Sequence, residues 1–150
     1  MPNPEKSLRS RFQRHTAVGR DRWRRRALLT QGGYYVLTGA WPLLHFSSFS
    51  RAVAIHTLPF QAHLFGAVMI VIGGYLLEAA RHGPPEASPT LLGIAVAAAI
   101  ALISLFWLTA MPGLSGLWVD LVAETGFAVT LAVNYPRPGT GRGRSTAWRP

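Results

Sequence analysis

The sequence predicts an all-α integral membrane protein, a four-helix up-and-down bundle with both termini in the cytoplasm. Three observations predict this fold: segregated charge, four apolar segments of membrane-spanning length, and short connections between them. The chain has 150 residues, of which 49% are apolar, and carries 15 Lys and Arg against 6 Asp and Glu. Residues 1–26 hold nine of the basic side chains and residues 136–150 hold four, whereas residues 27–135 hold two. A soluble domain alternates core and surface residues, so this long apolar run excludes that class.

The charge distribution divides the chain into three parts: a basic cytoplasmic segment over residues 1–26, a transmembrane domain over 27–135, and a basic disordered tail over 136–150. Residues 5–26 are expected to form a helix lying on the inner leaflet. Basic residues that flank membrane helices set topology and attract anionic lipid. We therefore expect anionic lipid at the cytoplasmic face, and not nucleic acid, as the partner of both ends.

Four segments reach the length of about 20 apolar residues that a membrane helix needs. The predicted spans are residues 27–46, 58–80, 90–111 and 115–135. Pro42 should bend the first span near its end, whereas Pro59 falls in the first turn of the second, where a missing N–H is harmless. Short connections, which make successive helices antiparallel neighbours, are predicted at residues 47–57, 81–89 and 112–113.

The count of basic residues on each side gives the orientation. In a four-span protein both termini share a side with the second linker, and that side collects fourteen Lys and Arg against Arg51 alone on the other. This imbalance predicts cytoplasmic termini and a multi-pass protein of the bacterial inner membrane. Aromatic residues also fall where membrane interfaces favour them, with Trp41, Trp107 and Trp118 at the outer ends of the spans and Trp23, Tyr75 and Tyr135 at the inner ends.

Small residues recur at helical spacing and permit close backbone contact between helices. They are Gly66, Gly73 and Gly74 in the second span and Gly93, Ala97 and Ala101 in the third. At the inner end of the second span, Glu78 and Arg81 are spaced for an i,i+3 ion pair.

Polar side chains within the spans are the candidate functional residues, because an ionisable group in the hydrocarbon costs about 2.5–3.5 kcal/mol on insertion scales. Asp120 and Glu124 lie four residues apart and share a face of the fourth span. Counting residues inward places both carboxylates in the outer half of the membrane. The predicted cluster comprises His45, His56, His63, Asp120 and Glu124, with Tyr34, Tyr35, Gln61, Arg51 and Trp41 as supporting residues.

A second polar patch, formed by Gln31, Tyr34 and Tyr35, lies in the cytoplasmic half of the first span. Its side chains are expected to form hydrogen bonds across the bundle.

Three interpretations of the His and carboxylate cluster stay open from the residues alone. The carboxylates can hold helices together, with Asp120 paired to His63 or Arg51. They can instead handle protons or line a pocket for a small polar ligand. Finally, His63, Asp120 and Glu124 can bind a divalent metal, because imidazole and carboxylate are suitable ligands, although no metal-binding motif accompanies them.

The chain has no Cys, which excludes disulfides, thiol nucleophiles and thiolate metal sites. No complete catalytic set is present, so we expect no enzymatic activity and no cofactor. The leading hypothesis is a non-enzymatic bundle that associates with itself or with another membrane protein, motivated by the small-residue ridges and minimal loops. The competing hypothesis is a transporter-like or enzyme-like protein with an outer-leaflet site for protons, a divalent metal or a small polar ligand.

The first span also resembles that of a group of small bacterial four-span membrane proteins of uncharacterised function. The matching residues are Tyr34, Tyr35, Thr38, Gly39, Trp41, Pro42, Leu43, His45 and Phe49, and the fourth span is similar in its Asp120 and Glu124. Between them the chain departs from the group, with His56 and His63 where the group has a Lys- and Asp-containing stretch. The resemblance implies the fold and membrane residence but no reaction. A looser likeness to DoxX-type proteins rests on architecture alone.

Overall fold

The computed structural model describes residues 4–53, 58–82, 87–110 and 116–136, and the side chains of these ranges from residue 19 onward. These residues form five helices: α1 (Pro4–Leu44), α2 (Phe46–Val53), α3 (Pro59–Arg81), α4 (Ala87–Ala110) and α5 (Gly116–Val133). The all-α prediction is confirmed. Within the described part of the chain, α3, α4 and α5 are long and apolar enough to cross a membrane, which is compatible with a multi-pass membrane protein.

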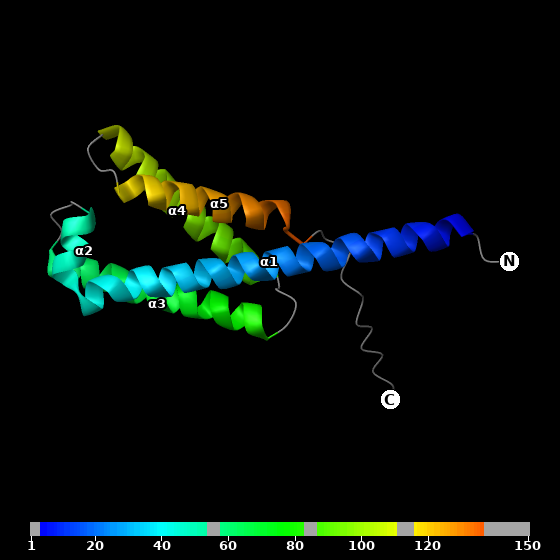
Figure 1. Ribbon diagram of the computed structural model, residues 1–150, viewed down its shortest axis with the longest axis horizontal. Coiled ribbons are helices and arrows are strands. Elements are labelled where there is room, and N and C mark those ends of the chain that lie inside the picture. Colours follow the sequence, from blue (N-terminus) through cyan, green and yellow to red (C-terminus); the bar gives the residue numbers. More distant parts are fainter. Residues whose placement is uncertain (1–3, 54–57, 83–86, 111–115, 137–150) are drawn as a thin grey trace, which may run out of the picture.

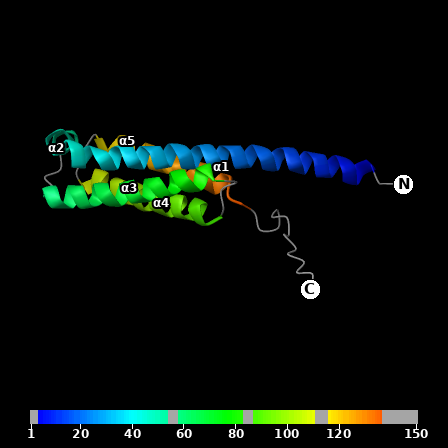
Figure 2. The same cartoon turned by 90° about the horizontal axis from the view of Figure 1, so that it is seen from below.

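The long helices form two antiparallel pairs, α1 with α3 and α4 with α5, which pack side by side (Figures 1 and 2). The short helix α2 folds back across one end of the bundle, and α1 projects beyond the other end, where α5 finishes (Figure 1). The N-terminus of α1 and the C-terminus of α5 therefore lie toward the same end of the bundle.

The bounds of α3, α4 and α5 agree with the predicted second, third and fourth spans to within a few residues. The predicted first span corresponds to the second half of α1, which runs without interruption through the basic segment. The segment predicted to lie on the leaflet is thus helical from Pro4 onward, but it continues the axis of the bundle (Figure 2). The part of α1 that corresponds to the predicted first span is less apolar than the other spans, because it contains Gln31, Tyr34, Tyr35 and Thr38.

The predicted loop at residues 47–57 is wrong in its first part, because residues Phe46–Val53 form α2. Trp41 holds this helix against the end of α1: its Nε1 donates to Ser48 Oγ at 2.8 Å, and its ring meets Phe49 edge-on with centroids 5.8 Å apart. Pro42 lies in the last turn of α1, which remains helical through it and ends at Leu44. Anchored by these contacts, α2 covers one end of the bundle.

Two glycine pairs bring the backbones of α1 and α3 together. A Cβ on Gly73 would lie 2.6 Å from the Gly32 carbonyl oxygen, and a Cβ on Gly39 would lie 2.6 Å from the Gly66 carbonyl oxygen. Both pairs are buried and stand seven residues apart on each helix, so the small residues form one continuous seam. The expected close contact is confirmed for Gly66 and Gly73, whereas a Cβ on Gly74 would meet nothing within 4 Å.

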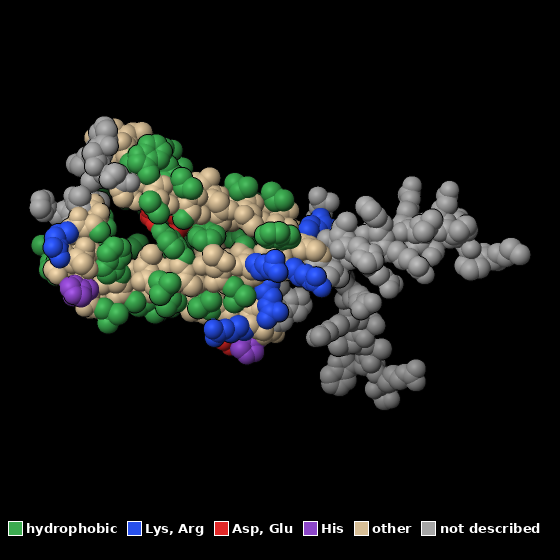
Figure 3. Space-filling model, viewed as in Figure 1, with side chains coloured by type: hydrophobic (Ala, Val, Ile, Leu, Met, Phe, Trp, Pro, Cys, Tyr) green, Lys and Arg blue, Asp and Glu red, His purple; other side chains and the backbone are tan. Residues whose placement is uncertain are grey.

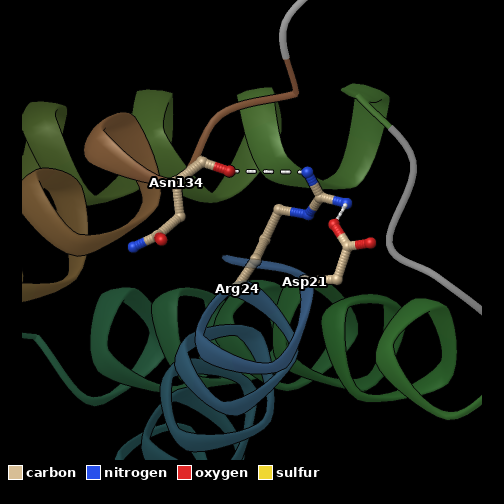
Figure 4. A network of polar contacts seen from close by, with 3 residues as sticks. All are labelled: Asp21, Arg24 and Asn134. Carbon is tan, nitrogen blue, oxygen red and sulfur yellow. Dashed lines mark hydrogen bonds and ion pairs between the residues drawn. The ribbon is translucent and has the colours of Figure 1, made fainter. Parts of the chain in front are cut away.

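Two arginines of α1 reach the carboxyl ends of neighbouring helices. Arg24 is buried; it pairs with Asp21 at 2.9 Å and donates from Nη1 to the Asn134 carbonyl oxygen at 3.4 Å (Figure 4). Arg25 Nε donates to the Ala80 carbonyl oxygen at 2.8 Å. The last carbonyls of a helix have no partner within it and attract cations, so these arginines stabilise the ends of α5 and α3.

The prediction of an ion pair between Glu78 and Arg81 is wrong. Glu78 Oε1 pairs instead with His82 Nδ1 at 2.9 Å, one residue further along α3. Both groups are exposed, so this pair contributes little to stability.

Candidate functional site

The polar residues of α1 and α5 form one network inside the bundle. Tyr34 donates from Oη to Asp120 Oδ1 at 2.5 Å, and Tyr35 donates from Oη to Glu124 Oε2 at 2.7 Å. Adjacent residues on α1 thus contact two carboxylates that are four residues apart on α5. The sequence predicted two polar patches at different depths, whereas helix packing joins them at one level.

Gln31 extends this network to α4. Its Nε2 donates both to Tyr35 Oη at 2.9 Å and to the Gly93 carbonyl oxygen at 2.9 Å. Gly93 permits this approach, because a Cβ at that position would lie 2.8 Å from Gln31 Oε1. Gln31, Tyr35 and Glu124 have no exposed surface, so this half of the network is buried. Buried polar groups need partners, and the three residues mostly supply them for one another.

The other half of the network faces a cavity of about 430 Å³ between the two helix pairs. Its polar lining comes from Tyr34, Thr38 and Asp120 together with the buried Glu124, and its apolar lining comes from the end of α1, from α2, α3 and α4, and from the first turn of α5. Figure 3 shows the hollow from the side of the bundle, near the α2 end, with acidic side chains visible inside it. The volume lies within the range of about 300–1,000 Å³ that is typical of small-molecule sites.

The two described histidines of the predicted cluster, His45 and His63, do not line the cavity. His45 is exposed at the break between α1 and α2, where its Nδ1 lies 3.4 Å from Ser47 Oγ. His63 is half-buried, and its ring meets Phe46 edge-on with centroids 5.8 Å apart. Within the described residues no hydrogen bond or ion pair joins His63 to Asp120 or Glu124. The interpretation in which His63 or Arg51 pairs with Asp120 is therefore wrong: Tyr34 takes that place.

The remaining predicted residues divide between cavity and surface. Trp41 lines the cavity. Gln61 and Arg51 are exposed, and Arg51 Nε donates to the Ser47 carbonyl oxygen at 3.1 Å within α2. His56 lies outside the described residues.

A metal is not favoured by this arrangement. Among the residues that the structure describes, no group of three or more His, Asp or Glu side chains is placed to hold an ion. The polar neighbours of the carboxylates are tyrosine hydroxyls, each of which donates a hydrogen bond to one carboxylate oxygen. The site can accept hydrogen bonds, exchange protons or attract positive charge.

The sequence indicated every member of the network but not their pairing. Tyr34, Tyr35 and Glu124 each lie near the middle of a predicted span. Their similar depth in the membrane is the signal that could have predicted their contact. Helix rotation decides which residues meet, and the apolar periodicity of such uniformly apolar spans does not specify it.

Comparison with protein-family models, with curated proteins and with solved structures finds no match to this chain. The resemblance of its first and fourth spans to small bacterial membrane proteins therefore stays a prediction.

Proposed function

We propose that this protein is a four-span protein of the inner membrane, with both termini in the cytoplasm, whose interior cavity binds a small polar ligand through Asp120 and Glu124. The observation that carries the proposal is the pairing of two intramembrane carboxylates with Tyr34 and Tyr35 at the wall of a cavity of about 430 Å³. Intramembrane carboxylates are costly, and their usual use is functional.

The surface of the bundle supports membrane residence. Large apolar side chains are exposed along all four long helices, including Leu37 at 74%, Val71 at 71%, Leu102 at 67% and Val122 at 69%. Soluble monomers do not expose contiguous apolar surface on this scale. The aromatic residues expected at the two interfaces are exposed as well: Trp41, Trp107 and Trp118 near the α2 end, and Trp23, Tyr75 and Tyr135 near the other.

The glycine packing bears on the choice between a ligand site and self-association. Three of the small residues that motivated self-association are used within the chain: Gly66 and Gly73 pack against Gly39 and Gly32 of α1, and Gly93 accommodates Gln31. The cavity has no such internal use. It therefore favours the site-bearing hypothesis over a bundle that acts by packing alone.

Cysteine accessibility tests this proposal, because the natural chain has no Cys. Thr38 lines the cavity, whereas its neighbour Leu37 is 74% exposed on the outer surface, toward lipid in the proposed orientation. Thr38→Cys and Leu37→Cys, each the single thiol of the chain, are treated in membranes with a small, uncharged hydrophilic thiol reagent. Faster modification of Thr38→Cys is expected, because only that thiol faces the cavity.

A denatured sample of each variant is the control, and in it both thiols should react equally. If folded Thr38→Cys is inert while its denatured form reacts, the cavity is closed to small polar molecules and the proposal fails.

A further inference from the structure

We infer that the ligand of this cavity is a small organic cation with an apolar group, held by Asp120 and Glu124. This inference rests on the proposed ligand-binding function and adds the chemical class of the ligand. It depends on three features of the cavity: its charge, an unpartnered carboxylate oxygen, and its aromatic walls.

The charge of the cavity has one sign. Its lining includes two carboxylates and holds no Lys, Arg or His among the described residues. The nearest polar neighbours of the carboxylates are tyrosine hydroxyls, which donate hydrogen bonds but carry no positive charge. In a low-dielectric bundle such carboxylates attract a cation more strongly than they would in water. An anionic ligand would meet repulsion without any compensating donor of positive charge.

Glu124 supplies the second feature. Its side chain is fully buried and lines the cavity, yet only Oε2 has a partner, the Tyr35 hydroxyl. Within the described residues, Oε1 has no hydrogen-bond partner. A buried acceptor without a donor is costly, so the site is built to receive a donor that the described part of the chain does not provide. An ammonium group supplies both that donor and the countercharge.

The aromatic walls distinguish an organic cation from a metal ion. Trp41, Phe49 and Phe65 line the cavity together with aliphatic side chains. Aromatic faces attract alkylammonium groups, whereas divalent metals need several oxygen or nitrogen ligands at fixed geometry. The volume is also too large for a bare ion and suits a molecule with an apolar body. The hollow is visible from the side of the bundle, which suits an amphipathic ligand that enters from the lipid (Figure 3).

Three molecules with the same ring and different charge test the inference on the full-length protein in detergent. They are benzylammonium, benzyl alcohol and benzenesulfonate, with binding measured by isothermal titration calorimetry. The wild-type protein should bind the cation roughly tenfold or more tightly than either other molecule. Asp120→Asn and Glu124→Gln should each weaken the cation roughly tenfold and leave the neutral molecule unchanged. Glu78→Gln, which removes an exposed carboxylate far from the cavity, is the matched control.

The wild-type comparison stands even if a variant fails to fold. Equal binding of the cation and the neutral molecule would overturn the inference, as would tighter binding of the anion or no binding of the cation. Accessibility of Thr38→Cys separates this failure from failure of the proposed function: a thiol that reacts in a protein without cation preference leaves a ligand site of another class.

Discussion

Tyr35 lies where the buried network converges, since its hydroxyl accepts from Gln31 and donates to Glu124. The side chain has no exposed surface, and Glu124 would have neither oxygen paired without it. The tyrosines of α1 are therefore the partners of the two carboxylates. His63, which the sequence analysis considered as a partner of Asp120, packs against Phe46 instead.

Removal of the Tyr35 hydroxyl should destabilise the protein. Tyr35→Phe is expected to lower the free energy of unfolding by about 1–3 kcal/mol, because it leaves buried polar groups unsatisfied. Tyr34→Phe should cost less, since Tyr34 and Asp120 are only half-buried at the cavity wall. Unfolding in mixed detergent micelles measures both, with the exposed Tyr75→Phe as the control. A Tyr35→Phe protein as stable as Tyr75→Phe would contradict the assigned hydrogen bonds.

The seam between α1 and α3 is a property of whole elements, and one glycine tests it. Gly73→Ala should destabilise the protein by about 1–3 kcal/mol, because its Cβ would lie 2.6 Å from the Gly32 carbonyl oxygen and the helices must separate. Gly74→Ala, one residue along, has open space and should leave stability unchanged or raise it by up to about 1 kcal/mol, because Ala favours the helix over Gly. The same unfolding measurement compares them. Equal effects at both positions would argue against the assigned rotation of α3.

The basic segment gives a second prediction at the scale of elements. Arg24→Ala should lower the free energy of unfolding by about 1–3 kcal/mol, because this buried guanidinium contacts Asp21 and the end of α5. Arg22→Ala removes the same charge from an exposed position and should be nearly neutral. Equal stabilities of the two variants would mean that Arg24 acts only through its charge at the membrane surface.

Some of the helices could be predicted from the sequence and others could not. Length and apolarity suffice to place α3, α4 and α5, because a span needs about 20 residues and Pro or turn residues mark its ends. Helix α2 was missed because its stability depends on Trp41, whose contacts with Ser48 and Phe49 exist only after the chain folds back. Arg24 and Arg25 stabilise the ends of α5 and α3. A count of charges cannot distinguish this role from that of setting the orientation in the membrane.

The same limit applies to the site. The identity of the polar residues is evident in the sequence, since any carboxylate in an apolar span needs a reason. Their pairing depends on the rotation of α1 and α5 about their axes, which the glycine seam fixes for α1 and the sequence pattern does not reveal. The cavity is a property of several helices together and has no signature in any one of them.

The orientation of the whole molecule in the membrane follows from the proposed cytoplasmic position of both termini. Two exposed positions lie at opposite ends of the bundle: Arg51 on α2 and Arg22 on the basic part of α1. Each is replaced by the single cysteine of the chain. In intact cells whose inner membrane is reachable, an impermeant thiol reagent should modify Arg51→Cys, while Arg22→Cys should react only after the membrane is permeabilised. The reverse pattern would place the cavity end in the cytoplasm.

The central claim is that the carboxylates of α5 face the tyrosines of α1 inside a bundle that lies in the membrane. Solid-state NMR of the ¹³C-labelled full-length protein in lipid bilayers tests this claim directly. We expect close contacts between Tyr34 Cζ and Asp120 Cγ and between Tyr35 Cζ and Glu124 Cδ. Carboxyl carbons that show contacts with lipid acyl chains, and none with the tyrosine rings, would contradict it.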